Sequence, residues 1–179
     1  MSSLALQPYA PPSAGEIVVL GIGNTLLTDD GIGIVVVREL ADAAAAAPAP
    51  EPTDDRPAVV YHDGGTIGLA LLPLIENTAG VILVDAANFG GSVGEVRLFE
   101  GEAMDALLRV NRSTPHEIAV SDLILTAELI GTCPDRRALV AIQAGDLTLG
   151  DTPQPAVAAA VPEARAHVAA IIDRWGGRA

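Results

Sequence analysis

The chain has 179 residues, of which half are hydrophobic, 3% are aromatic and one is a cysteine. This length suits one domain with a sizeable hydrophobic core. The formal net charge of −13 disfavours nucleic acid and anionic membranes as partners, because both require a basic face. A single cysteine excludes an intramolecular disulfide and favours a cytoplasmic location.

The sequence is predicted to form a tail and one domain. The Pro- and Ser-containing segment 1–14 is expected to be a flexible tail, without the basic and apolar regions of a signal peptide. One domain is expected over 15–177. No apolar run reaches the roughly 18 uninterrupted residues that are typical of a membrane helix.

In chain order, hydrophobic patterning and breaker residues predict the elements of this domain. They are a strand at 16–23, a helix at 31–46, an Ala-Pro-rich surface loop at 43–57, a strand at 58–65, a helix at 66–77, a strand at 80–87, a turn and short strand at 90–100, a helix at 102–110, a helix at 113–131, a strand at 137–145 and a helix at 155–177. This alternation predicts an α/β fold, with a doubly wound, twisted, mostly parallel five-stranded sheet between helix layers.

The stretch GIGNTLLTDDGIG (21–33) follows the first predicted strand and first suggests a phosphate-binding loop. Leu26 stands where a dinucleotide-binding loop has its third glycine, and the acidic pair Asp29–Asp30 would repel a pyrophosphate. Asp63, at the end of the second predicted strand, could imitate a ribose-binding acid. Nucleotide binding is therefore the weaker of two readings.

The stronger reading is a metal site. Ligands of doubly wound sheets bind outside the carboxyl ends of the strands. Asp30 follows the first strand, Asp85 ends the third, and strands about 4.8 Å apart would let both carboxylates reach one ion. His116 lies in the first turn of a predicted helix, where the cationic form of histidine is disfavoured. Two carboxylates and one imidazole with open positions suit a divalent metal.

Several acidic residues have a simpler role as helix caps. One of Asp29 and Asp30 is expected to cap the helix that follows. Asp63 is expected to cap the next helix through its DGGT turn. Thr114 and Glu117 form a capping box around Pro115.

No residue forms a conventional nucleophile motif. The glycine-rich stretch lacks the Lys-Ser or Lys-Thr of a P-loop, and the chain contains no G-x-S-x-G elbow. Cys133 has no histidine near it in sequence and is interpreted as a structural thiol. His62 and His167 are weaker ligand candidates than His116, and His167 is expected on a solvated helix face.

Four blocks of the sequence form a recognisable series: VVLGIGNTLLTDDGIG (18–33), DGGT (63–66), ILVDAANFGGSVGEVRLF (82–99) and STPHEIAVSDLI (113–124). Together they resemble the hydrogenase maturation proteases, which trim the C-terminal extension of the large subunit of nickel–iron hydrogenases. They occur in the family's order and together span most of residues 16–145.

The resemblance implies an endopeptidase with an α/β fold and no conventional nucleophile. It implies that Asp30, Asp85 and His116 are the catalytic, nickel-sensing residues, and that the partner is a hydrogenase large-subunit precursor. Nickel would arrive in that substrate, and no cofactor would be tightly bound. The metal could polarise the scissile carbonyl or activate water, or an aspartate pair could act as acid and base. The alternative from another class is a non-catalytic metal or nucleotide sensor on a Rossmann-like fold.

Overall fold

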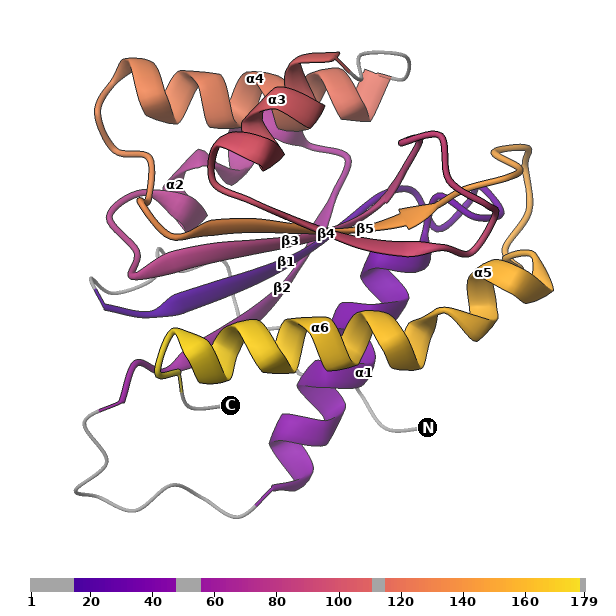
Figure 1. Ribbon diagram of the computed structural model, residues 1–179, viewed down its shortest axis with the longest axis horizontal. Helices are drawn as coiled ribbons and strands as arrows, with labels where there is room; N and C mark the ends of the chain where they lie inside the picture. Colours follow the sequence, from indigo (N-terminus) through magenta and orange to yellow (C-terminus); the bar gives the residue numbers. More distant parts are fainter. Residues whose placement is uncertain (1–14, 48–55, 111–114, 178–179) are drawn as a thin grey trace.

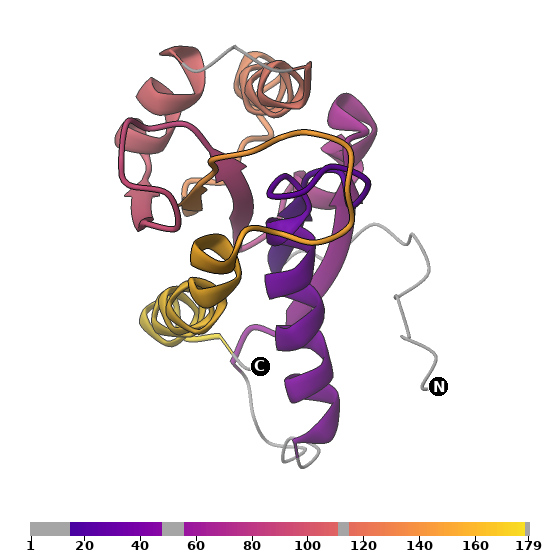
Figure 2. The same ribbon diagram turned by 90° about the vertical axis from the view of Figure 1, so that its right-hand side faces the viewer.

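One sheet between two helix layers forms the molecule, shown in two views in Figure 1 and Figure 2. The computed structural model describes residues 15–47, 56–110 and 115–177, except for the side chains of 115–119. The strands are β1 (Ile17–Ile22), β2 (Val59–Gly65), β3 (Gly80–Ala87), β4 (Val96–Glu100) and β5 (Arg137–Gln143), in the spatial order β2-β1-β3-β5-β4. Only β4 pairs antiparallel, along β5. The predicted α/β fold with a mostly parallel five-stranded sheet is confirmed.

The helices divide between the two faces of the sheet (Figure 1). One face carries α1 (Ile32–Ala46), α5 (Pro155–Ala159) and α6 (Val161–Arg174), and the other carries the 3₁₀ helix η1 (Gly68–Leu71) with α2 (Leu72–Ile75), α3 (Glu102–Val110) and α4 (Pro115–Leu129). The predicted helix at 155–177 is divided into α5 and α6, and Pro162 lies in the first turn of α6.

Alternating side chains of the strands build one core on each face. In β1, Ile17 and Val19 pack toward α1 and α6, whereas Val18 and Leu20 pack toward the opposite layer. Every residue of β3 is buried. Strands of a parallel sheet that is covered on both faces consist mostly of apolar residues, so short apolar runs in the sequence could predict their positions.

Two predicted segments differ from the structure. The expected helix at 66–77 is instead the short pair η1 and α2, because Gly68 adopts a left-handed φ of 53° and Glu76 is already extended. The helix α1 continues through Ala46, so the first residues of the expected loop 43–57 are helical. Residues 48–55 of that loop, and the predicted tail 1–14, lie outside the described residues.

Among the described residues, Pro155–Arg174 has the length and apolar composition that could cross a membrane. In this fold the same stretch forms α5 and α6, and its apolar side chains serve the core. Those buried in α6 are Val161, Ala164, Val168, Ile171 and Ile172. One face of α6 therefore packs against the sheet.

Candidate active site at the carboxyl edge of the sheet

The strand order reverses between β1 and β3. From β1 the chain passes to the edge strand β2, and it then crosses back to β3 on the other side of β1. The two strands pair in parallel, with Gly21 opposite Val84. Ligands of doubly wound sheets bind in the crevice outside such a switch point. Asp30 follows β1 and Asp85 lies near the end of β3, so both residues belong to the carboxyl ends of these neighbouring strands.

A glycine contact brings the turn after β1 against the end of β3. A Cβ on Gly33 would lie 2.2 Å from the carbonyl oxygen of Val84 and 2.5 Å from that of Ile22. Only a residue without a side chain permits this approach. The first turn of α1 therefore packs directly on the backbone that precedes Asp85.

The turn itself is shaped around Asp30, whose side chain is 0% exposed. The backbone N–H of Asn24 donates to Asp30 Oδ2 at 2.7 Å. Gly23 has a φ of 127°, and a Cβ there would lie 1.9 Å from the Asp30 carbonyl oxygen. A phosphate-binding loop offers its backbone N–H groups to the ligand, whereas this turn gives one to its own carboxylate. In this respect the turn differs from a phosphate-binding loop.

Asp85 and His116 belong to two further elements. Asp85 is 3% exposed and lies opposite Ala141 of β5, two residues before β3 ends. His116 is the second residue of α4, and its side chain lies outside the described residues. The first turn of α4 lies toward the same end of the molecule as the arrowhead of β5 in Figure 1. The structure thus buries Asp30 after β1 and Asp85 near the end of the neighbouring strand β3, whereas the roles of Asp30, Asp85 and His116 as ligands stay predictions.

The neighbour of Asp30 has a different role from the one predicted. The helix α1 begins after Gly31 with no side-chain cap, so the expectation that Asp29 or Asp30 caps it is wrong. Asp29 is 0% exposed and accepts three backbone N–H groups from the connection between β5 and α5. Because these donors are distant in sequence, no local pattern predicts them. In the fold, the Asp29 carboxylate accepts their N–H groups instead of capping α1.

The predicted cap at Asp63 is also wrong. Its Oδ2 accepts from Nη2 of Arg38 in α1 at 2.8 Å, and its Oδ1 accepts the N–H of Gly65 at 3.0 Å. The helix η1 begins after Ile67 without a side-chain cap. Asp63 therefore shapes the DGGT turn and pairs with α1. The proposed cap Thr114 lies outside the described residues.

Gln143 is a polar residue of the site that the sequence analysis missed. It ends β5, and its buried Oε1 accepts the N–H groups of Phe89 and Gly91 at 3.0 and 3.1 Å. Its Nε2 donates to Asn88 Oδ1 at 3.3 Å and to the Ala144 carbonyl at 3.0 Å. Gln143 thereby fixes the loop that follows β3. A lone amide ending an apolar strand, in ALVAIQ, was the available signal.

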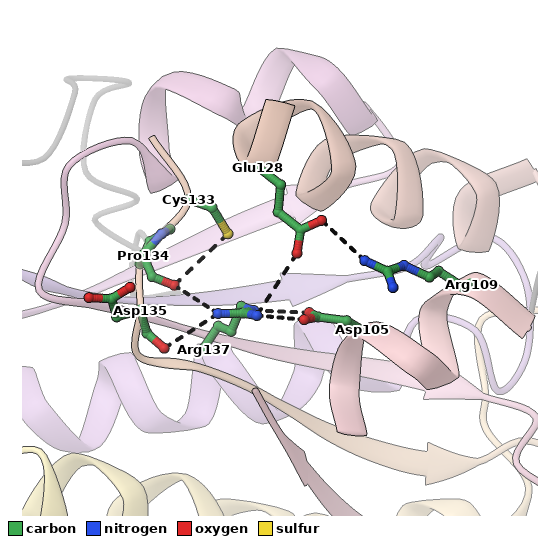
Figure 3. A network of polar contacts seen from close by, with 7 residues as sticks. All are labelled: Asp105, Arg109, Glu128, Cys133, Pro134, Asp135 and Arg137. Carbon is green, nitrogen blue, oxygen red and sulfur yellow. Dashed lines mark hydrogen bonds and ion pairs between the residues drawn. The ribbon is translucent and has the colours of Figure 1, made fainter. Parts of the chain in front are cut away.

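The remaining candidates lie elsewhere. Cys133 is half-buried near the ion pairs between α3, α4 and β5 drawn in Figure 3. Burial raises the pKa of its thiol, with Arg137 acting in the opposite direction, so the reactive thiolate is disfavoured. His62 is buried within β2. His167 is partly exposed on α6, with its Nε2 3.9 Å from Glu163.

Fold and site together define an α/β protein with buried carboxylates at the switch point of a doubly wound sheet. Residues 36–171 match the family model of the hydrogenase maturation proteases. The chain is 34% identical over 162 residues to the hydrogenase expression/formation protein HupD of Rhodobacter capsulatus, covering 90% of this chain and 73% of that one. It is 30% identical over 128 residues to the hydrogenase 2 maturation protease of Escherichia coli, covering 71% and 72%.

The similarity extends to solved structures. The hydrogenase maturating endopeptidase HybD from E. coli superposes with a TM-score of 0.77 at 28% identity, covering 90% of this chain and 94% of that one. The solution structure of an endopeptidase from E. coli superposes with a TM-score of 0.75 at 29% identity over the same shares. This chain therefore belongs to the hydrogenase maturation protease family and is a peptidase.

Proposed function

We propose that this peptidase removes the C-terminal extension of a nickel–iron hydrogenase large-subunit precursor after nickel insertion. Asp30, Asp85 and His116 recognise the nickel that the precursor carries. The observation that supports the proposal is that Asp30 and Asp85 are both buried and lie after β1 and near the end of β3, two strands that pair in parallel. Carboxylate oxygens and an imidazole can occupy positions that thiolates leave open on a divalent ion.

Exposed leucines beside the crevice support a protein substrate over a small ligand. Leu26, in the loop that carries Asp30, is 67% exposed, and Leu149, in the connection after β5, is 85% exposed. The two segments are joined, since Gly150 donates its N–H to the Leu26 carbonyl at 3.0 Å and Leu27 forms a β-bridge with Leu149. Large apolar side chains gathered at one exposed rim are typical of protein contacts.

The three proposed ligands do not close a coordination shell. Isolated peptidase should therefore hold free nickel weakly, and the precursor should complete the shell with its own metal and softer ligands. Docking through the metal would align the scissile bond, and cleavage would depend on nickel in the substrate. Within this arrangement the metal polarises the carbonyl or activates water, or the two aspartates exchange protons with the substrate.

The test is a processing assay on nickel-loaded and nickel-free precursor, read by the mass of the product. Wild type should cut only the loaded precursor, Asp85→Ala and His116→Ala should not cut, and Asp30→Asn should cut more slowly because an amide is a poorer ligand. Cys133→Ser is the control and should cut normally. Equal cutting of both precursors would contradict nickel recognition. Tight binding of free nickel without any cleavage would favour the sensor alternative.

A further inference from the structure

The carboxylate of Asp29 holds together two loops at the carboxyl edge of the sheet. Its Oδ2 accepts the N–H groups of Gly145 and Asp146 at 2.9 and 2.8 Å, and its Oδ1 accepts the N–H of Gln154 at 2.7 Å. All three donors belong to the connection between β5 and α5. A fully buried carboxylate is costly unless such donors surround it, so its presence calls for a specific explanation.

Backbone contacts extend this junction along both loops. The N–H of Asp29 donates to the Asp146 carbonyl at 3.1 Å, and Thr28 donates its Oγ1 hydroxyl to the same carbonyl at 2.7 Å. The N–H of Thr28 donates to the Thr148 carbonyl at 3.0 Å. The β1–α1 loop and the β5–α5 connection therefore form one unit, which we call the Asp29 latch.

The latch adjoins the two segments that carry the proposed site residues Asp30 and Asp85. On one side Asp29 precedes Asp30, whose Oδ2 accepts the N–H of Asn24. On the other side the latched segment begins just after Gln143, whose amide fixes the loop that follows the strand of Asp85. A shift of the β5–α5 connection would thus be transmitted to the carboxylates on either side.

We propose that Asp29 is a positioning residue, which fixes the orientation of Asp30 by latching the β5–α5 connection onto the β1–α1 loop. This inference rests on the proposed function for its effect on catalysis. Both carboxylate oxygens of Asp29 are occupied by backbone donors, so Asp29 acts through its neighbour and not on the substrate. Catalytic groups must be held closely, and a displacement of about 1 Å can slow a reaction about 100-fold.

Two variants break the latch in different ways. Asp29→Asn keeps the shape of the side chain, but replaces one acceptor oxygen by an NH₂ group that faces a backbone donor. Gln154→Pro leaves the Asp29 carboxylate intact and removes the N–H that reaches Oδ1, together with the Gln154 side-chain amide, at a position whose φ of −56° suits proline. The matched control is Asp151→Asn, which removes the same charge from an exposed side chain of the same connection.

Cleavage of nickel-loaded precursor gives the first readout. Asp29→Asn and Gln154→Pro should lower kcat about tenfold or more with little change in KM, whereas Asp151→Asn should match wild type. Loss of stability alone would leave the kcat of the folded fraction unchanged. Wild-type kcat in folded Asp29→Asn would overturn the proposal. Loss of activity in Asp29→Asn with full activity in Gln154→Pro would also overturn it, and would indicate a direct role for the carboxylate.

Amide hydrogen exchange gives a second readout that does not depend on any substrate. The Asn24 amide, which reports the hydrogen bond to Asp30, should exchange about tenfold faster in Gln154→Pro than in wild type, and at the wild-type rate in Asp151→Asn. Unchanged exchange would overturn the latch even if Asp29→Asn fails to fold. If wild type does not cut the precursor, the proposed function fails, and the exchange result still decides whether Asp29 positions Asp30.

Discussion

Asp29 and Asp30 are adjacent in sequence and equally buried, yet their carboxylates have different partners. The donors to Asp29 come from the distant β5–α5 connection, whereas Asn24, in the same turn, donates to Asp30. The sequence predicted a division of roles within the pair but assigned one member to a helix cap. At the scale of a single residue, long-range donors decide which role each carboxylate has, and they leave no mark in the local pattern.

His62 allows a test, also at the scale of one residue, of how burial of a side chain changes the pH dependence of stability. Burial in β2 lowers the pKa of His62, and Glu16 partly opposes this effect. The unfolded state, with a histidine pKa of about 6.5, therefore binds a proton more readily than the folded state. The contribution of His62 to stability should fall as the pH drops below about 6.5, down to its folded pKa.

Replacing the imidazole should remove this component of the pH dependence. We expect His62→Gln to show a smaller loss of unfolding free energy than wild type between about pH 7 and pH 5.5. His167→Gln, at a partly exposed site on α6, is the comparison variant that removes an imidazole from outside the core. Urea denaturation at several pH values measures the effect, and an unchanged slope in His62→Gln would contradict it.

At the scale of the element, the turn between β1 and α1 depends on glycine. We expect Gly23→Ala to lower the unfolding free energy by about 2 kcal/mol or more, because it combines a disfavoured φ with a contact to the Asp30 carbonyl. Gly101→Ala is the control, with a φ of 52° and no atom within 4 Å of the added Cβ. Its cost should be about 1 kcal/mol. Equal denaturation midpoints for the two variants would show that the turn adapts.

How well the sequence predicted each element depends on where its stabilising contacts lie. β3 and α3 were predicted with their observed bounds, since an apolar run and an amphipathic pattern are local signals. The pair η1–α2 was not, because Gly68 and the extended Glu76 override the apolar pattern between them. In the candidate site, the positions of Asp30 after β1 and of Asp85 in β3 could be predicted, because both strands are apolar runs that local patterning reveals. The partners of Asp63 and Asp29 could not, because they arise only in the folded chain.

At the scale of the whole molecule, the two ends of β5 are held by different polar groups. Gln143 ends the strand near the proposed site, whereas Arg137 begins it at the opposite edge of the sheet. Arg137 donates to both oxygens of Asp105 in α3, with its Nε 2.9 Å from Oδ1, and its Nη2 lies 3.9 Å from Glu128 of α4 (Figure 3). This network connects α3 and α4 to the sheet, far from the crevice.

Breaking this network should affect stability more than catalysis. Asp105→Ala leaves the guanidinium of Arg137 largely buried without its main partner, and should cost about 3 kcal/mol of unfolding free energy. Arg109→Ala, which removes a more exposed ion pair with Glu128, is the control and should cost less than about 1 kcal/mol. Denaturation and precursor cleavage should be measured together. A large fall in the kcat of folded Asp105→Ala would show that the network also serves the site.

The latch has a consequence for the order in which the chain is made. Gly145, Asp146 and Gln154 follow Asp29 by 116, 117 and 125 residues, so the carboxylate leaves the ribosome long before any of its donors. Contacts between such distant residues close late, because they must overcome the entropy of a long loop. We expect a nascent chain to keep Asp29 hydrated until the sheet and the β5–α5 connection are in place. An enzyme that cuts another protein would then acquire its cutting geometry only after the ribosome has made the β5–α5 connection.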